Sequence, residues 1–238
     1  MVNNVRVAVR VRPFNQREID RNAKMCIQMG NDKKKTTITN PEDGRVREFT
    51  FDYSYWSHDA NDEHFVDQEE VFNNLGVDCL ESAWEGYNCS LFAYGQTGSG
   101  KSFSMVGNAA SDEVLHGSQA GIVPRVCRSM FDRIAAMDDP SVTFKVETSM
   151  LEIYNEQVRD LFNPTNASAG GLKVREHPTT GPFVDGLSSL LVENNAAIEQ
   201  LMEQGTKART IKSTKMNQTS SRAHTIFQII LTQTRVDK

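Results

Sequence analysis

One eight-residue run constrains this chain more than any other feature. Residues 95–102 read Gly-Gln-Thr-Gly-Ser-Gly-Lys-Ser, which matches the phosphate-loop pattern G-x-x-x-x-G-K-[ST] in full. The three glycines of this run allow the backbone to fold around a polyphosphate with its N–H groups pointing inward. The pattern predicts a nucleoside triphosphate site in which Lys101 reaches the β- and γ-phosphates and Ser102 places its hydroxyl on Mg²⁺.

The residues on either side of the loop fit this interpretation. Residues 89–94, Cys-Ser-Leu-Phe-Ala-Tyr, form a short and mostly apolar run that is typical of a buried strand, and a helix can begin at Gly100. The alternative is a Gly/Ser-rich turn beside an incidental lysine. A strand before the loop and a helix after it argue against that alternative.

A second polar segment lies near the C-terminus. Residues 217–224 read Asn-Gln-Thr-Ser-Ser-Arg-Ala-His, directly before a run of alternating apolar and polar residues. Two adjacent hydroxyls, an amide and a guanidinium on one loop suit a sensor of γ-phosphate and Mg²⁺. Taken alone, the segment also fits a polar loop with a helix cap. Beside a full phosphate-loop match, we favour the sensor.

Together these segments resemble the kinesin motor domain. That family's phosphate loop reads G-Q-T-x-S-G-K-[ST] and its first switch reads N-x-x-S-S-R-S-H. Residues 10–13, Arg-Val-Arg-Pro, match its R-x-R-P motif on the adenine side, and residues 151–156, Leu-Glu-Ile-Tyr-Asn-Glu, extend a likeness that covers nearly the whole chain. Residues 174–178 and 207–210 look most like the kinesin-3 subfamily.

The resemblance implies ATP and Mg²⁺ as cofactors and gives the motif residues their roles. Pro13 and Phe103 would stack on the adenine, although Phe103 is alternatively a core residue. Ser102 and Ser221 would contact Mg²⁺. The nucleotide-binding set is Arg10, Arg12, Pro13, Gly95, Gln96, Thr97, Gly98, Ser99, Gly100, Lys101, Ser102 and Phe103. The catalytic set is Asn217, which helps to place the attacking water, Ser220, Ser221 and Arg222, which pairs with an acid of the second switch.

Two departures from the family pattern affect what we expect of this sequence. Ala223 replaces the third serine of the first switch, so we expect slower or less tightly coupled hydrolysis. No D-x-x-G-x-E second switch follows within residues 1–238. The resemblance therefore predicts the N-terminal part of a motor domain, truncated before the second switch and weak or inactive by itself. It also predicts an open strand edge beside residues 225–234.

Charge is unevenly distributed along the chain. The net charge of −5 argues against general nucleic-acid binding. Residues 58–70 contain aspartates and glutamates but no lysine or arginine, whereas residues 205–215 contain lysines and arginine but no acid. Two further basic spots lie at residues 33–35 and at Lys173 with Arg175. Such runs are either solvated faces or a basic surface for an acidic polymer. Kinesins bind the acidic surface of tubulin, so the resemblance implies microtubules as the partner and leaves the cargo open. The basic residues of the run are Lys207, Arg209, Lys212 and Lys215.

Composition indicates one domain in a reducing compartment. A chain of 238 residues with 38% apolar content can bury a sizeable core, and no run is long enough to span a membrane. The N-terminus has no secretory segment. The four cysteines lack metal-ligand spacing, so we expect reduced side chains and a cytoplasmic location on the microtubule cytoskeleton.

Hydrophobic periodicity predicts an α/β fold. Strands are expected at residues 5–11, 142–154 and 225–234, and small β-structure at residues 22–53. Helices are expected at residues 68–87 and 122–137 and from residue 195. We expect a P-loop NTPase in which a central mixed β-sheet is flanked by helices on both faces, as a single domain over residues 1–238.

The leading hypothesis is therefore an ATP-dependent microtubule motor, wholly or in part. One alternative is a fragment that binds nucleotide or tubulin without turnover. Another is an unrelated P-loop NTPase, such as a myosin-like or small assembly ATPase. The R-x-R-P motif and the Gln96-Thr97 pair argue against the last hypothesis.

Overall fold

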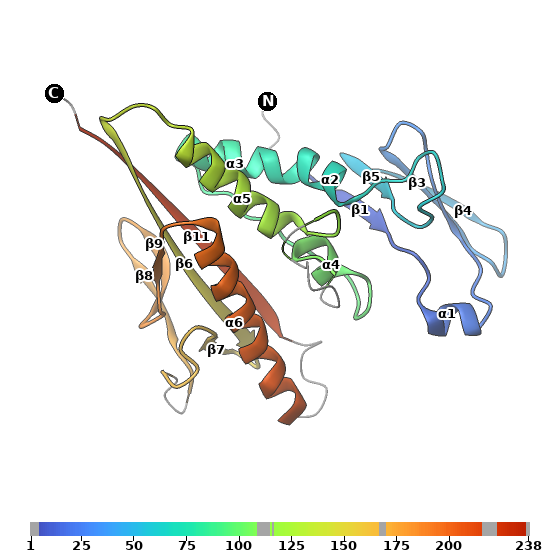
Figure 1. Cartoon of the computed structure of the whole chain (residues 1–238). Coiled ribbons are helices and arrows are strands. Elements are labelled where there is room, and N and C mark those ends of the chain that lie inside the picture. Colours follow the sequence, from blue (N-terminus) through green and yellow to red (C-terminus); the bar gives the residue numbers. More distant parts are fainter. Residues whose placement is uncertain (1–4, 109–114, 116, 167–169, 216–222, 237–238) are drawn as a thin grey trace. The chain divides into compact units, whose positions relative to one another are not determined.

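The structure is a computed structural model that describes residues 5–108, 115, 117–166, 170–215 and 223–236, with the side chains of residues 210–215 excepted. The chain divides into two compact units. Unit 1 comprises residues 1–78 and 91–122, and unit 2 comprises residues 79–90 and 123–238. Figure 1 labels most of the helices and strands of both units.

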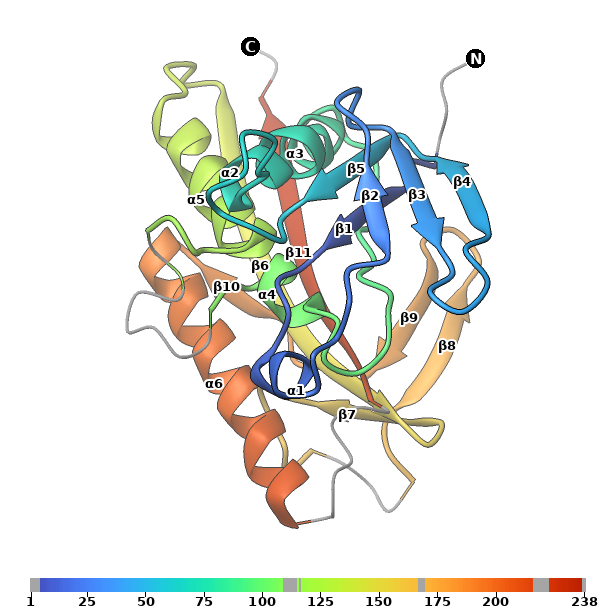
Figure 2. The same cartoon turned by 90° about the vertical axis from the view of Figure 1, so that its right-hand side faces the viewer.

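Unit 1 contains a parallel strand pair and a small antiparallel sheet. Strand β1 (Ala8–Val11) pairs in parallel with β5 (Tyr53–Trp56). Between them the chain forms α1 (Gln16–Asp20) and the sheet β2-β3-β4, whose strands span Ile27–Met29, Lys35–Thr39 and Val46–Thr50 (Figure 2). The predicted small β-structure is confirmed. Strand β1 is shorter than the strand predicted at residues 5–11, because only residues 8–11 of that segment pair with β5.

The helix predicted for residues 68–87 is present and ends a little earlier. It consists of α2 (Gln68–Val71), a π-helical turn (Phe72–Gly76) and α3 (Val77–Trp84). Asp67 caps its start, because its carboxylate accepts a hydrogen bond from the backbone N–H of Glu70. A side chain at Gly76 would overlap the Phe72 ring, so the π-helical turn requires glycine there.

The predicted buried strand at residues 89–94 is wrong. Residues 88–94 form neither helix nor strand, and Phe92 and Tyr94 are 85% and 101% exposed. A strand needs a hydrogen-bonded neighbour, and none of the described strands pairs with this segment. The predicted helix after it is confirmed, since α4 (Lys101–Met105) begins directly after Gly100.

Unit 2 is built on one long antiparallel pair. Strand β6 (Val142–Tyr154) pairs with β11 (His224–Arg235) over the whole of β11 (Figure 2). The other edge of β6 carries β10 (Leu190–Val192) and β7 (Gln157–Asp160). Strands β8 (Lys173–His177) and β9 (Gly181–Asp185) form a separate exposed hairpin.

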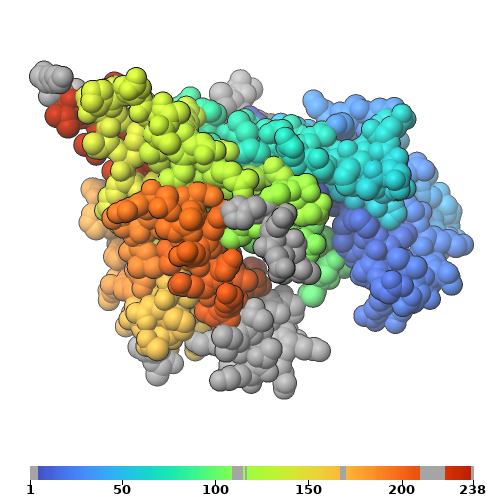
Figure 3. Space-filling view, in the orientation of Figure 1, coloured from blue at the N-terminus to red at the C-terminus, as the bar shows by residue number. Residues whose placement is uncertain are grey.

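Helices α5 (Ile122–Ala135) and α6 (Asn195–Lys215) share the apolar core of unit 2 with β6, which contributes buried Val146, Met150 and Leu151. Cys127 of α5 and Ile198 of α6 are both fully buried. A side chain at Gly205 would overlap the sulfur of Met150, so α6 approaches β6 closely at this glycine. The outward side of α6 faces solvent, where the space-filling view shows it in orange (Figure 3).

Strand β11 is present as predicted, and its alternation is visible in its burial. Phe227 and Ile229 are half-buried, whereas Ile226 and Ile230 are 45% and 39% exposed. Among the described strands only β6 pairs with β11, and an open opposite edge stays a prediction.

The cysteines differ from the expectation that all four are reduced. Cys79 and Cys89 form a disulfide, and Cys26 and Cys127 are free thiols. The chain turns back after α3 at Gly86, which has a φ of +90° and brings the two Cα atoms to 5.6 Å.

Taken together, helices and both parallel and antiparallel ladders confirm a mixed α/β protein, although the described strands form four separate sheets. None of the described helices has the length and apolar character that a membrane span requires. That the chain is a single domain stays a prediction.

Candidate nucleotide-binding site

The phosphate-loop pattern forms a glycine-dependent bend. Gly95, Gly98 and Gly100 have φ values of +153°, +80° and +94°, in the region that favours glycine. A side chain at Gly95 would also lie 2.5 Å from the hydroxyl of Ser99. The backbone N–H of Ser99 donates to the carbonyl of Gln96 at 3.1 Å and closes the turn. The three glycines are therefore required by the backbone itself.

Lys101 turns its ammonium group onto this bend. Its Nζ donates to the carbonyl oxygens of Gly95 at 2.7 Å and Gln96 at 2.9 Å. Both partners are neutral acceptors on the loop, so an anionic phosphate oxygen can replace them with a stronger, charge-assisted bond. Ser102, at the start of α4, is exposed. Glycines with positive φ, an ammonium group on the loop and an accessible hydroxyl fit a bound polyphosphate and Mg²⁺.

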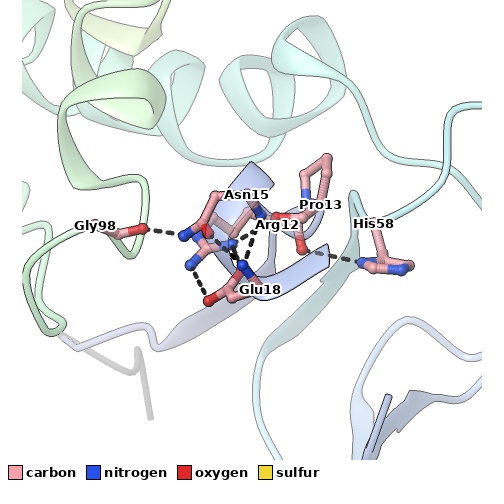
Figure 4. Close-up of polar contacts among 6 residues, drawn as sticks. All are labelled: Arg12, Pro13, Asn15, Glu18, His58 and Gly98. Atoms are coloured by element: carbon pink, nitrogen blue, oxygen red, sulfur yellow. Dashed lines mark hydrogen bonds and ion pairs between the residues drawn. The ribbon is translucent and has the colours of Figure 1, made fainter. Parts of the chain in front are cut away.

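Arg12 directly follows β1, and its side chain contacts the middle of the phosphate loop (Figure 4). Its Nε donates to the carbonyl of Gly98 at 2.7 Å. Its two terminal nitrogens donate to the two carboxylate oxygens of Glu18 at 2.7 and 2.8 Å, a bidentate pair. Nη1 also donates to the carbonyl of Pro13 at 2.6 Å. Arg12 is therefore held in one orientation, with one face on the phosphate loop and the other on α1.

Glu18 is itself fixed by the start of α1. Its carboxylate accepts from the backbone N–H of Asn15 at 2.8 Å, and its own N–H donates to the Asn15 side chain at 2.9 Å. This reciprocal pair is a capping box. The hydrogen bond from Arg12, with the second from the Asn15 backbone, lowers the pKa of Glu18 to about 2. Glu18 is thus ionised throughout the physiological range.

Arg10, two residues earlier on β1, faces the interior of unit 1. Its Nε donates to Ser57 Oγ at 2.8 Å, and its Nη1 donates to Gln68 Oε1 at 2.6 Å and Ser104 Oγ at 3.0 Å. Its guanidinium carbon also lies 5.4 Å from the ring centre of Phe103. Burial lowers the pKa of Arg10 from its ordinary value. Arg10 joins β1 to the helix that follows the phosphate loop.

The two residues expected to stack on adenine have different surroundings. Pro13 is exposed, and its carbonyl is bonded to Arg12. Phe103 is half-buried under Arg10. Their role in base stacking stays a prediction. Next to Pro13, His58 Nδ1 lies 3.2 Å from the carbonyl oxygen of Arg12 (Figure 4). The His58 ring also packs edge-on against Phe14.

The predicted first-switch residues lie outside the described part of the chain. The structure describes α6 up to Lys215 and the chain again from Ala223. The roles predicted for Asn217, Ser220, Ser221 and Arg222 therefore stay predictions.

Several of the basic residues singled out from the sequence are ion-paired within the chain. Arg209 of α6 lies 3.8 Å from Glu152 of β6, and Lys207 lies 3.4 Å from Glu203. Arg175 pairs with Asp185 across the β8–β9 hairpin at 2.6 Å. These pairs reduce the net positive charge that each basic spot presents.

Three residues that the sequence interpretation missed take part in this network. Asn15 and Glu18 had a readable signal, because an Asn followed three residues later by Glu is a capping-box pattern. Buried Gln68 had none, since its partners Arg10, Phe103 and Gln119 are distant in sequence.

Comparison with known proteins identifies the family. The sequence matches the kinesin motor domain family over residues 10–238. The chain belongs to this family. Kinesin-related protein 1 of Dictyostelium discoideum is 49% identical over 99% of this chain, and the rat kinesin-like protein KIF1A is 48% identical over 98%. These relatives include members of the kinesin-3 family, which confirms the subfamily resemblance. The chain spans only 11% and 13% of those two kinesins.

Solved kinesin structures agree with the fold. A KIF14 motor in complex with a microtubule and ADP aligns over 98% of this chain, with a TM-score of 0.82 and 38% identity. A fast kinesin aligns over 96%, with a TM-score of 0.85 and 31% identity. The chain covers 63% and 60% of those two structures. The P-loop NTPase fold of the kinesin motor domain is thereby confirmed.

Proposed function

We propose that this chain is the ATP-binding part of a microtubule-based motor that couples ATP hydrolysis to movement. The observation that carries the proposal is the loop at residues 95–102, where three glycines with positive φ shape a bend and Lys101 donates its ammonium group to two carbonyls of that bend. Membership of the kinesin family supports the same function, because solved relatives are described in complex with a microtubule and with ADP or AMP-PNP.

The site residues divide into two sides. On the phosphate side, the loop from Gly95 to Ser102 binds the phosphates, Lys101 moves from its loop carbonyls to the terminal phosphate oxygens, and Ser102 offers its hydroxyl to Mg²⁺. On the base side, Arg10 lies near the ribose and base, with Pro13 and Phe103 against the adenine, while Arg12 contacts the loop at Gly98. When bound, ATP supplies the γ-phosphoryl group that is cleaved, and Mg²⁺ supplies the positive charge that neutralises the phosphates.

The first switch completes the proposed chemistry. We assign Asn217 to placing the attacking water, Ser220 and Ser221 to sensing the γ-phosphate, with Ser221 on Mg²⁺, and Arg222 to an ion pair with an acidic residue. Loss of the third hydroxyl at Ala223 slows hydrolysis and leaves nucleotide binding intact. Microtubules are the proposed partner, and the microtubule cytoskeleton of the cytoplasm is the proposed location.

Phosphate release with and without microtubules tests this proposal. We expect turnover that rises with polymer concentration, and co-sedimentation of the chain with microtubules and not with actin filaments. Nucleotide binding with a flat baseline of phosphate release would instead assign a binding module without turnover. Co-sedimentation with actin filaments but not with microtubules would show that microtubules are the wrong partner.

A further inference from the structure

Gln68, the first residue of α2, makes three side-chain hydrogen bonds next to the predicted site. Its side chain is buried, and the residue is only 2% exposed. Its Oε1 accepts a hydrogen bond from Arg10 Nη1 at 2.6 Å. Its Nε2 donates to the carbonyl oxygen of Phe103 at 2.7 Å and to that of Gln119 at 3.2 Å. One carboxamide thus joins α2 to β1, to α4 and to the segment before α5, all within unit 1.

The three partners require a side chain that accepts one hydrogen bond and donates two, and the amide of glutamine does both. Arg10 can only donate, so it must face an oxygen, and the two carbonyls can only accept, so they must face an N–H group. A carboxylate keeps the contact with Arg10 and turns lone pairs toward both carbonyls. A thioether of similar length satisfies none of the three and leaves a buried guanidinium with one partner fewer.

The location of these bonds connects Gln68 to the nucleotide. Phe103 belongs to the same short helix as Lys101 and Ser102, and its carbonyl is the point at which Gln68 bonds to that helix. Arg10 is bonded to the same helix through Ser104 Oγ at 3.0 Å. We infer that Gln68 is a positioning residue of the nucleotide site, which fixes α4 and Arg10 to each other and so sets where Lys101 and Ser102 meet the phosphates.

This inference rests on the proposed nucleotide site, and its test separates the two. We would prepare Gln68→Glu and Gln68→Met and measure Kd for Mg·ATP and for tripolyphosphate by titration calorimetry. We expect Kd for both ligands to rise by a similar factor, about 5- to 20-fold, because α4 carries the phosphate contacts and two buried hydrogen bonds are lost in Gln68→Glu and three in Gln68→Met. The Gln68→Glu variant retains the Arg10 contact, so it should be the milder variant and remain folded.

Two control variants distinguish positioning from loss of stability alone. Val71→Ala removes buried apolar atoms from the same helix, and Gln28→Met makes the same substitution at an exposed position of β2. Both should bind Mg·ATP within about twofold of the unmodified chain, although Val71→Ala lowers the urea midpoint. If Val71→Ala weakens binding as much as the Gln68 variants do, the role of Gln68 is merely structural and the inference is wrong.

Binding by the unmodified chain decides between the remaining outcomes. If it binds Mg·ATP and the folded Gln68 variants bind equally well, the inference fails and the proposed nucleotide site stands. If the unmodified chain binds neither Mg·ATP nor tripolyphosphate, the proposed site fails and the inference fails with it.

Discussion

The phosphate loop of unit 1 and the β6–β11 pair of unit 2 are held in place by different kinds of interaction. In the strand pair, a continuous backbone ladder runs from Val142 opposite Arg235 to Ile153 opposite His224. In the phosphate loop, the main supports are cationic side chains that donate to backbone carbonyls, from Arg12 to Gly98 and from Lys101 to Gly95.

This difference separates stability from binding. A backbone ladder over a buried face is lost only when the region unfolds, whereas a cation on a neutral carbonyl can exchange to an anion without unfolding. Substitutions beneath β6 and β11 should therefore change the free energy of unfolding and leave nucleotide affinity unchanged. Substitutions around the loop should do the reverse.

The largest effect is expected at Ile198, which is fully buried on α6. Ile198→Ala should lower the free energy of unfolding by about 2–5 kcal/mol, because it leaves a cavity in the core of unit 2. Urea denaturation gives this value, and Kd for Mg·ATP should stay within about twofold. Ile226→Ala, at a position that is 45% exposed, is the matched control and should cost less than about 1 kcal/mol. A tenfold loss of affinity in folded Ile198→Ala would break the separation.

A smaller effect, on affinity, is expected at Glu18. Glu18→Gln removes the bidentate carboxylate partner of Arg12, so Arg12 is less well fixed on the carbonyl of Gly98. Kd for Mg·ATP should rise by about 3- to 10-fold, which a fluorescent nucleotide analogue can report. Asp20→Asn on the same helix is the control, because its carboxylate accepts from Gln16 and lies outside the network. Equal losses in both variants would show that α1 as a whole, and not Glu18, matters.

The same carboxylate gives a pH prediction with a definite sign. The pKa of Glu18 is lowered from 4.5 to about 2 in the folded chain, so its contribution to stability is full above about pH 4.5. That contribution declines as the pH falls from 4.5 through 2. Urea midpoints of the unmodified chain and of Glu18→Gln should therefore differ most near pH 5 and converge toward pH 2. A difference that stays constant over this range would contradict the assigned ion pair.

The smallest expected effect is a difference in the number of reactive thiols, which tests whether Cys127 is buried in the core of unit 2. Burial raises the pKa of Cys127 to about 12, so this thiol should not react with a disulfide reagent at pH 8 in the native chain. Half-buried Cys26 should react, and Cys79 and Cys89 should not because they are bonded to each other. We expect one reactive thiol in the native chain and two in urea without reductant. Four thiols in urea would show that the disulfide is absent.

The two regions also differ in how much of them the sequence could predict. The strands at β6 and β11 follow from their alternation, because a period of two identifies a half-buried strand wherever its partner lies. The phosphate loop follows from its glycines, whose positive φ values are a local property of the backbone. Local sequence patterns were therefore enough to predict both strands of the pair and the phosphate loop.

Features that depend on a distant partner could not be predicted in this way. Residues 89–94 are as apolar as a buried strand, yet no described strand pairs with them and Tyr94 is fully exposed. The bonds of Gln68 and the pairing of Cys79 with Cys89 likewise depend on how the chain returns on itself. Composition and residue spacing do not show which segments the fold brings into contact.

Calorimetric titration of Mg·ATP into the unmodified chain and into Lys101→Ala tests the central claim most directly. Lys207→Ala, which removes an exposed lysine of α6, is the control. If the ammonium group exchanges from the carbonyls of Gly95 and Gln96 to the phosphates, Kd should rise about 10- to 100-fold in Lys101→Ala and stay unchanged in the control. Equal affinity in all three proteins would contradict the account, because the phosphate loop would then not be where the nucleotide binds.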